Sequence, residues 1–199
     1  MLKLAAVASV IVLACHTAAA SELPIGGNIV AGSGSISQTP GSMTVTQITD
    51  KMATDWQAFN IGAGNSVDFV QPSASSIALN RVLGSDVSMI QGKLTANGQV
   101  FLINPNGVLF TPTAQVNVGG LVASTLNISN PDFIAGSFKF TTNSSNAIGS
   151  SSAIINQGNI TAINGGSITL IAAKINNDGI LTANTGNVLL GAATQVTLD

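Results

Sequence analysis

The residues that most often carry nucleophilic or metal chemistry lie together near the start of the chain. The only cysteine and the only histidine are neighbours, Cys15 and His16, and the chain has no tyrosine. A Ser-His-Asp or Cys-His arrangement needs an imidazole beside the nucleophile, and most zinc sites need His or Cys ligands. A mature chain without these two residues would therefore lack both kinds of chemistry.

The acidic residues do not predict a paired-carboxylate site. General acid–base cleavage of a glycosidic bond needs two carboxyl groups at a fixed, short separation. Outside the first twenty residues the acids are spread singly: Glu22, Asp50, Asp55, Asp68, Asp86, Asp132, Asp178 and Asp199. The chain also has no acid-rich Ca²⁺ loop and no Gly-rich phosphate loop between a strand and a helix. The sequence therefore predicts a protein that is not an enzyme and has no cofactor.

The first twenty residues have the organisation of a secretory signal peptide. Lys3 gives a short positive start, residues 4–14 form an apolar stretch, and small residues follow before Ser21. This order of a charged, an apolar and a small-residue region is typical of exported precursors. We therefore predict a signal peptide over residues 1–20, with cleavage between Ala20 and Ser21.

Cleavage at that point would remove the thiol and the imidazole together. The mature chain, residues 21–199, would then form no disulfide, which suits a protein that crosses the cell envelope unfolded. Lipoprotein processing at Cys15 is an alternative, although the residues around it match the lipoprotein signal poorly.

Composition favours a β protein with a neutral, polar surface. Hydrophobic residues make up 45% of the chain, charged residues only 7%, and there are 21 glycines. Disordered chains are poorer in apolar residues and richer in charge, and surface helices need more Glu, Lys and Arg. The formal net charge of −2, without a basic stripe, argues against a nucleic acid partner. No run after the signal reaches the ~18 apolar residues that span a membrane as a helix.

Short strand signals follow one another along the first half of the chain. Residues 43–48 alternate between apolar and polar, which is the period of a half-buried strand. Asn97-Gly98 is a frequent type I′ turn sequence, so we expect a hairpin that joins residues 92–95 to the apolar residues 100–103.

The last third of the chain contains an internal repeat. An ungapped alignment of residues 155–174 with 175–194 pairs Ile155 with Ile175 and Asn156 with Asn176. A period of about twenty with short strands predicts a solenoid, and the leucine spacing of leucine-rich repeats is absent. A parallel β-helix fits better, because Asn at a recurrent turn can stack along the axis and Gly can form the corners.

Two segments interrupt this pattern. Residues 130–140 begin with Asn-Pro-Asp, contain three phenylalanines and break the repeat, so we expect the chain to leave the helix there. Residues 141–153 are of low complexity and predict a loop or a weak coil. The clearest coils are expected over residues 154–199.

The tetrapeptide Asn104-Pro105-Asn106-Gly107 (NPNG) predicts a β-turn. Pro105 fixes the backbone for the second turn position, and Gly107 accepts the closing conformation. The turn would end the apolar strand 100–103 and lead into residues 108–110. It can serve only as a tight turn, or it can help a partner to recognise the chain and start its folding.

Other residues also leave a structural and a functional interpretation open. Arg81, the only arginine, follows Asn80. It can contact an acidic partner surface, or it can form an ion pair with Asp68 or Asp86. Three aromatic residues favour core or cap packing over a sugar-stacking platform: Trp56, Phe59 and Phe69.

Beyond these local patterns, much of the chain resembles the haemagglutination-activity domain at the start of filamentous haemagglutinins. The same domain opens related adhesins, haemolysins and contact-dependent inhibition toxins that are exported by two-partner secretion. The resemblance extends from about residue 24 to the end of the chain, and a second family motif, NPNL, is absent. It is carried by Phe59-Asn60-Ile61-Gly62, Val67-Asp68-Phe69-Val70-Gln71-Pro72, Asn80-Arg81-Val82, Gly98-Gln99-Val100-Phe101-Leu102-Ile103-Asn104-Pro105-Asn106-Gly107-Val108 and Gly120-Leu121-Val122-Ala123-Ser124-Thr125-Leu126.

The resemblance implies a fold, a partner and a location. The fold would be all-β: a right-handed, single-stranded parallel β-helix with an N-terminal cap and extra-helical β-hairpins. The partner would be an outer-membrane transporter of the TpsB type, from the Omp85 group, with POTRA domains that recognise the chain in the periplasm. The NPNG residues would carry recognition, with Asn80 and Arg81 as further contacts. The protein would reach the cell surface or medium of a Gram-negative bacterium.

Three functional hypotheses follow. The first is a secretion module, residues 21–199, that targets an exoprotein to its transporter and starts β-helix folding outside the cell. The second is a stand-alone adhesin that binds a host glycan or cell surface, and the third and weakest is a glycan-cleaving enzyme. Such domains usually head a much longer passenger, so we expect this chain to be a fragment, a truncated remnant or a small exoprotein.

Overall fold

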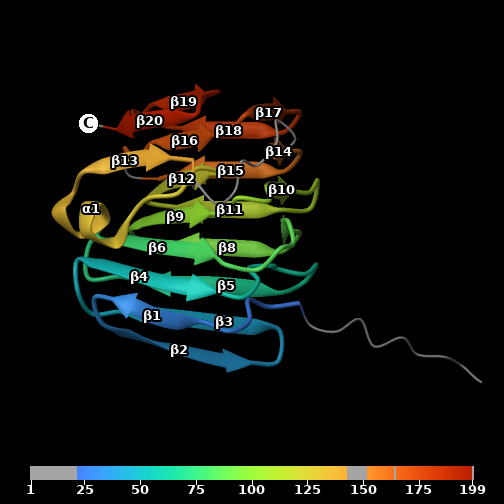
Figure 1. Ribbon diagram of the computed structural model, residues 1–199. Helices are drawn as coiled ribbons and strands as arrows, with labels where there is room; N and C mark the ends of the chain where they lie inside the picture. The colour runs from blue at the N-terminus through green and yellow to red at the C-terminus, as the bar shows by residue number, and fades with distance from the viewer. Residues whose placement is uncertain (1–21, 143–151, 164, 199) are drawn as a thin grey trace, which may run out of the picture.

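The computed structural model describes residues 22–142, 152–163 and 165–198, and they form a solenoid of strands (Figure 1). Three sheets wrap around one axis in about six turns. Each full coil contributes one strand to each sheet in turn, and neighbouring coils pair in parallel. The fold is thus the right-handed parallel β-helix that the resemblance implied.

The three sheets differ in length and in what lies over them. We call them the covered, the uncovered and the short sheet. The covered sheet contains β1 (Asn28–Ala31), β4 (Lys51–Trp56), β6 (Ile77–Val82), β9 (Gln99–Ile103), β12 (Gly120–Ser124), β16 (Ile168–Ile171) and β19 (Val188–Gly191). The uncovered sheet contains β2 (Gly34–Thr39), β3 (Ser42–Gln47), β5 (Ser66–Val70), β8 (Lys93–Ala96), β11 (Gln115–Val118), β15 (Asn159–Ala162) and β18 (Ile180–Ala183). The short sheet contains β7 (Ser88–Ile90), β10 (Val108–Phe110), β14 (Ala153–Asn156) and β17 (Lys174–Asn177).

Two antiparallel strands close the N-terminal end of the solenoid. β1 pairs with β4 at the edge of the covered sheet, and β2 pairs with β3 at the edge of the uncovered sheet. The predicted strand at residues 43–48 is β3, which shows strict alternation of half-buried and buried side chains. These strands cover the edges of the first coil that would otherwise offer unpaired backbone groups, and they form the cap that the resemblance implied.

The lumen of the solenoid is an apolar core. One buried cluster runs along the axis and includes Val45, Phe69, Leu94, Val116 and Ile160. The three aromatic residues weighed as a possible sugar platform lie in this cluster: Trp56, Phe59 and Phe69, each 1% exposed. Their assignment to core packing is therefore confirmed.

The repeat exists, but its predicted register is wrong by one residue over its first half. Ile154 pairs with Ile175, and Asn156 pairs with Asn177, so these coils are offset by 21 residues. Only β16 and β19 keep the offset of 20, with Ile168 opposite Val188. The reason is a turn of unequal length, because residues 163–167 connect β15 to β16 whereas residues 184–187, one fewer, connect β18 to β19.

The predicted hairpin at Asn97-Gly98 is also wrong. β8 belongs to the uncovered sheet and β9 to the covered sheet, so these neighbours form a corner rather than an antiparallel pair. Asn97 instead bonds to Gln71 of the preceding coil, and its Oδ1 accepts from the Gln71 backbone N–H at 2.7 Å. Stacking between coils therefore determined the path here, and the local preference of Asn-Gly for a hairpin did not.

After β12 the chain leaves the solenoid, as predicted for residues 130–140. It forms α1 (Asn130–Ala135) and then β13 (Phe138–Thr141), which pairs antiparallel with the distant β20 (Gln195–Leu198). The side chain of Ser129 caps the start of α1, and Gly136 ends it in the left-handed conformation. We call residues 126–142 the excursion.

The excursion and β20 bury the outer face of the covered sheet in a second apolar cluster. Figure 1 shows α1, β13 and β20 beside the strands of this sheet. The buried members are Ala53, Ile77, Leu79, Phe101, Ile103, Val122, Leu126, Ile128, Phe133, Phe140 and Ile171. β9 is consequently buried on both faces, which explains why its sequence is a continuous apolar run.

Two predictions concern residues that the structure does not describe. The signal peptide and its cleavage site fall within residues 1–21, and most of the low-complexity segment falls within residues 143–151. Within the described ranges, no helix is long and apolar enough to cross a membrane.

Candidate recognition and folding site

The NPNG residues form the predicted turn at one corner of the solenoid. Gly107 donates its backbone N–H to the carbonyl oxygen of Asn104 at 3.0 Å, which closes the turn. Gly107 has φ = +119°, and a Cβ there would lie 2.8 Å from the Ala153 carbonyl oxygen. The turn joins β9 of the covered sheet to β10 of the short sheet, as the sequence predicted.

The Asn104 side chain is buried and fully engaged inside the protein. Its Nδ2 donates to the Asp86 carbonyl oxygen and to Ser88 Oγ, both at 2.9 Å. Its Oδ1 accepts from the backbone N–H of Asn106 at 2.9 Å. Asn104 has no exposed surface, so it links two coils through hydrogen bonds that water cannot replace.

Asn106 strengthens the same link from the rim of the turn. Its Nδ2 donates to the Gly84 carbonyl oxygen at 2.8 Å, and the residue is partly exposed. The two asparagines therefore bond to two carbonyl groups of the loop between β6 and β7, one coil earlier, and to the hydroxyl group of the first residue of β7.

The turn also contacts the following coil at the point where the excursion begins. The Asn104 backbone N–H donates to the carbonyl oxygen of Ser124, the last residue of β12, at 2.9 Å. Ser124 Oγ in turn accepts from the Leu126 N–H and donates to the Leu126 carbonyl oxygen, both at 2.9 Å. NPNG thus lies between the loop of one coil and the exit of the chain from the next.

Asn80 lies inside the solenoid and not on its surface. It is completely buried, and its Oδ1 accepts from the Trp56 indole N–H at 3.0 Å. Its Nδ2 donates to the Ala78 carbonyl oxygen at 3.1 Å. In the folded domain Asn80 therefore satisfies the polar atom of the only tryptophan and has no surface for a partner.

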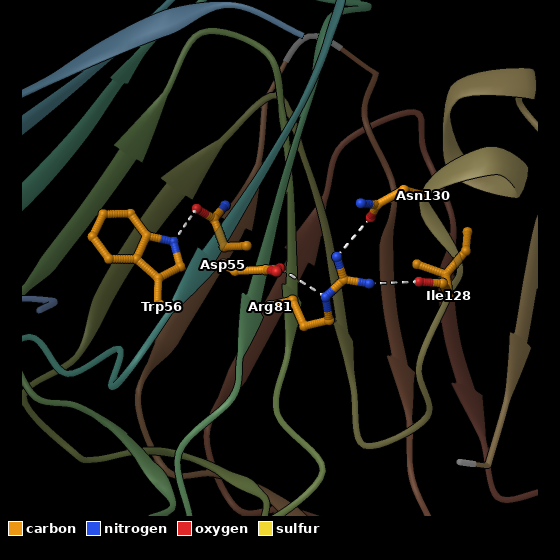
Figure 2. A network of polar contacts seen from close by, with 6 residues as sticks. Asp55, Trp56, Arg81, Ile128 and Asn130 are labelled. Carbon is orange, nitrogen blue, oxygen red and sulfur yellow. Dashed lines mark hydrogen bonds and ion pairs between the residues drawn. The ribbon is translucent and has the colours of Figure 1, made fainter. Parts of the chain in front are cut away.

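Arg81 connects the first coils to the excursion (Figure 2). Its Nε donates to Asp55 Oδ1 at 2.8 Å. The two terminal nitrogens donate to the Ile128 carbonyl oxygen at 3.1 Å and to Asn130 Oδ1 at 2.6 Å. The Arg81 side chain is only 12% exposed, so its donors are used within the protein.

The predicted ion pairs of Arg81 with Asp68 or Asp86 are wrong. Asp55 and Arg81 are opposite residues of β4 and β6, and this places them on the same side of the covered sheet. Asp68 lies in the uncovered sheet, where it accepts from Thr95 Oγ1 at 2.5 Å. Asp86 approaches the NPNG turn instead, through its carbonyl oxygen.

Lys51 is a second cation that holds the excursion, and no sequence pattern predicted this role. Its Nζ donates to the Ile134 carbonyl oxygen in the last turn of α1 at 2.9 Å and lies 5.7 Å from the centre of the Phe138 ring. Like Asp55 and Asn130, it could be found only once the pairing of β4 with β6 and the path of the excursion were known.

These contacts connect parts of the fold to one another. In the described part of the chain, no three His, Cys, Asp or Glu residues lie close enough to hold a metal ion. The polar groups around NPNG and Arg81 form hydrogen bonds that join coils to one another and to the excursion.

Comparison with known proteins identifies the family to which this chain belongs. The family model of the TPS secretion domain matches residues 20–199. The chain belongs to the two-partner secretion family. Members of this family are exoproteins that a Gram-negative bacterium secretes to its surface or medium through a transporter of the TpsB type.

Solved and curated relatives agree with this assignment. The crystal structure of the HMW1 secretion domain from Haemophilus influenzae matches with a TM-score of 0.82 and 34% identity over 87% of this chain and 46% of that one. A haem/hemopexin-binding protein of Haemophilus influenzae is 46% identical over 126 residues, 61% of this chain and 14% of that protein. A second protein with this name and from this species is 41% identical over 145 residues, 71% of this chain and 16% of that protein. The chain therefore spans only a small part of these curated relatives.

Proposed function

We propose that residues 21–199 are a secretion module that the transporter recognises before the module folds. The precursor would lose residues 1–20 by cleavage between Ala20 and Ser21, cross the periplasm unfolded and meet the POTRA domains of an Omp85-type transporter. Folding would follow at the cell surface. The proposal rests on the family match over residues 20–199 and on the burial of Asn104, the first residue of NPNG.

The geometry of NPNG supports recognition of the unfolded chain. In the folded domain the Asn104 side chain is buried, and its amide is bonded to Asp86 and Ser88. The same holds for Asn80, which is buried, and for Arg81, whose nitrogens are all in use. A transporter that contacts these side chains must do so before the coils have stacked.

The same turn would then start folding outside the cell. NPNG connects three successive coils, because its side chains bond to the loop before it and its backbone to Ser124 after it. Each coil that stacks buries apolar side chains and pairs its backbone, so it opposes return of the chain through the transporter. Directional export would thus need no nucleotide.

The experiment is co-expression of the chain with the genomically nearest Omp85-type transporter, followed by assay of the medium. The test variant is Asn104→Ala/Asn106→Ala. The matched control is Ile160→Ala, a lumen substitution in β15 outside the turn, provided that the two variants unfold at the same urea concentration. If export falls much further in the NPNG variant than in the control, the transporter recognises the motif itself.

Two other outcomes would change this proposal. Equal losses in both variants would assign NPNG to folding alone. Export that is independent of the transporter would reject the secretion module in this form.

The alternative of a stand-alone glycan-binding or haem-binding protein has less support. The aromatic residues weighed as a sugar platform are buried in the lumen. The ligands in the relatives' names belong to whole proteins of which this chain matches 14% and 16%. We therefore propose a non-enzymatic module whose partner is the transporter.

A further inference from the structure

The excursion is held by two parts of the chain that are far apart in sequence. Lys51 and Arg81 bind it from the first coils through the Ile134 and Ile128 carbonyl oxygens. At its other end, β13 pairs along its whole length with β20, the last strand that the structure describes. We call β20 (Gln195–Leu198) the latch.

The latch contributes an apolar face as well as backbone pairing. Phe138 lies opposite Leu198, and Phe140 lies opposite Val196. These four side chains belong to the second cluster, where Phe140 is completely buried and the others pack against it partly buried. The alternate residues, Lys139, Gln195 and Thr197, are exposed.

Phe101 is the residue of the solenoid on which the phenylalanine rings of the excursion pack. Its ring centre lies 5.4 Å from that of Phe138, 6.2 Å from Phe140 and 6.3 Å from Phe133. Phe101 lies on the outer side of β9, the strand that ends at the NPNG turn, and is 2% exposed. The excursion and β20 therefore bury the outer face of β9, and the lumen buries its inner face.

The side chains of the latch are less buried than those of the lumen strands. A groove of about 520 Å³ remains beside it, lined by Val122, Phe138, Thr169, Leu189 and Leu198 among others. Val196 and Leu198 are half-buried, whereas lumen residues of β16 such as Leu170 are fully buried. The side chains of β20 therefore pack against the second cluster and not into the lumen.

We propose that β20 is a conformational latch that closes the second core over β9 only after the coil of β17, β18 and β19 has formed. Before residues 195–198 are in place, β13 lacks its partner strand β20, and part of Phe138 and Phe140 is uncovered. The excursion would then open from the covered sheet while the solenoid stays intact. This inference concerns the folding of the chain and stands whether or not a transporter reads NPNG.

The first test compares Val196→Asp with Gln195→Asp by hydrogen exchange on the purified protein. Both changes add one charge to the same strand, but only Val196 faces the second core. In Val196→Asp we expect the amides of α1 and β13 to exchange about tenfold faster or more, while β9 and β12 keep their protection. Gln195→Asp should leave all four elements unchanged.

A second test locks the latch instead of releasing it. Lys139 and Thr197 are directly opposite and exposed, and Cys15 is the only native cysteine. In a Cys15→Ser background, Lys139→Cys/Thr197→Cys should form a disulfide, since opposite residues of an antiparallel pair lie within its reach. The oxidised form should slow exchange in α1 and β13 relative to its own reduced form.

Two results would overturn the proposal. Unchanged exchange in α1 and β13, both with Val196→Asp and with the disulfide, would make β20 a passive strand. Loss of protection throughout the lumen, in Val196→Asp and in the milder Val196→Ala, would show that β20 supports the solenoid itself and is no latch.

Discussion

Asn104 and Ser88 are joined by a hydrogen bond of 2.9 Å from Nδ2 to Oγ, and neither residue is more than 1% exposed. The bond links the NPNG turn to the first residue of β7, one coil earlier. A motif that resembles a surface turn in sequence is therefore a buried connection between coils.

Replacement of Asn104 by alanine should destabilise the domain more than replacement of Asn106. Asn104→Ala takes the donor from the buried Ser88 hydroxyl and from the Asp86 carbonyl, which costs about 2–3 kcal/mol. Asn106→Ala removes two bonds at the partly exposed rim, to the Gly84 carbonyl and to Asn104 Oδ1, and should cost about 1 kcal/mol because water can replace them. Urea unfolding followed by the fluorescence of Trp56, the only tryptophan and a buried one, measures both. Equal and small costs would contradict this account of the turn.

The turn could be predicted from sequence because it is local, whereas the register of the coils could not. Pro105 and Gly107 determine their own backbone, and the apolar run before them reveals a strand buried on both faces. The offset between coils depends on the length of the turn after β15, where one residue more or fewer leaves no mark in the repeat. Asn97-Gly98 was mistaken for a hairpin for a similar reason, because its partner, Gln71, lies in another coil.

The same limit applies to the candidate site. Asn80 and Arg81 were identified from the family resemblance, but their partners were not. Asp55 is opposite Arg81 only through the pairing of β4 with β6, and Asn130 reaches it only because the excursion folds back. Contacts between residues far apart in sequence follow from the tertiary path, which a local pattern does not contain.

Arg81→Lys should destabilise the domain although the charge is kept. A single ammonium group cannot reproduce the three directions in which the guanidinium donates to Asp55, Ile128 and Asn130. We expect a loss of about 2–4 kcal/mol for this partly buried network. The control Lys93→Met removes an exposed cation and should stay within about 0.5 kcal/mol.

A double-mutant cycle should connect Arg81 with Asp55. Asp55→Asn should cost less in an Arg81→Met background than in the native chain, with a coupling energy of about 1 kcal/mol or more. Thermal unfolding of the four proteins under the same conditions gives this value. Simple additivity would mean that the ion pair between β4 and β6 does not contribute to the stability of the domain.

Gly119→Ala should be poorly tolerated because glycines stack at the corner between the uncovered and the covered sheet. A Cβ at Gly119 would lie 2.6 Å from the carbonyl oxygen of Gly98, the residue to which its own N–H donates. Overpacking of this kind costs about 1–3 kcal/mol. Gly191→Ala is the control, since its nearest neighbour outside the strand would be a Val196 methyl group at 3.8 Å. Similar unfolding midpoints for the two variants would refute the steric argument.

Asn156 should matter more than Asn177, although the two stack on each other along the axis. Asn156 is buried, donates from Nδ2 to Asn177 Oδ1 at 2.8 Å and accepts from the Gly158 N–H at 3.2 Å. Asn156→Ala removes both bonds and leaves the Gly158 N–H without an acceptor, which costs about 2 kcal/mol. Asn177 is exposed, so water can replace what Asn177→Ala removes, and its cost should stay under about 1 kcal/mol. Urea unfolding of both single variants and of the double variant tests this order. A larger cost for Asn177→Ala than for Asn156→Ala would contradict it.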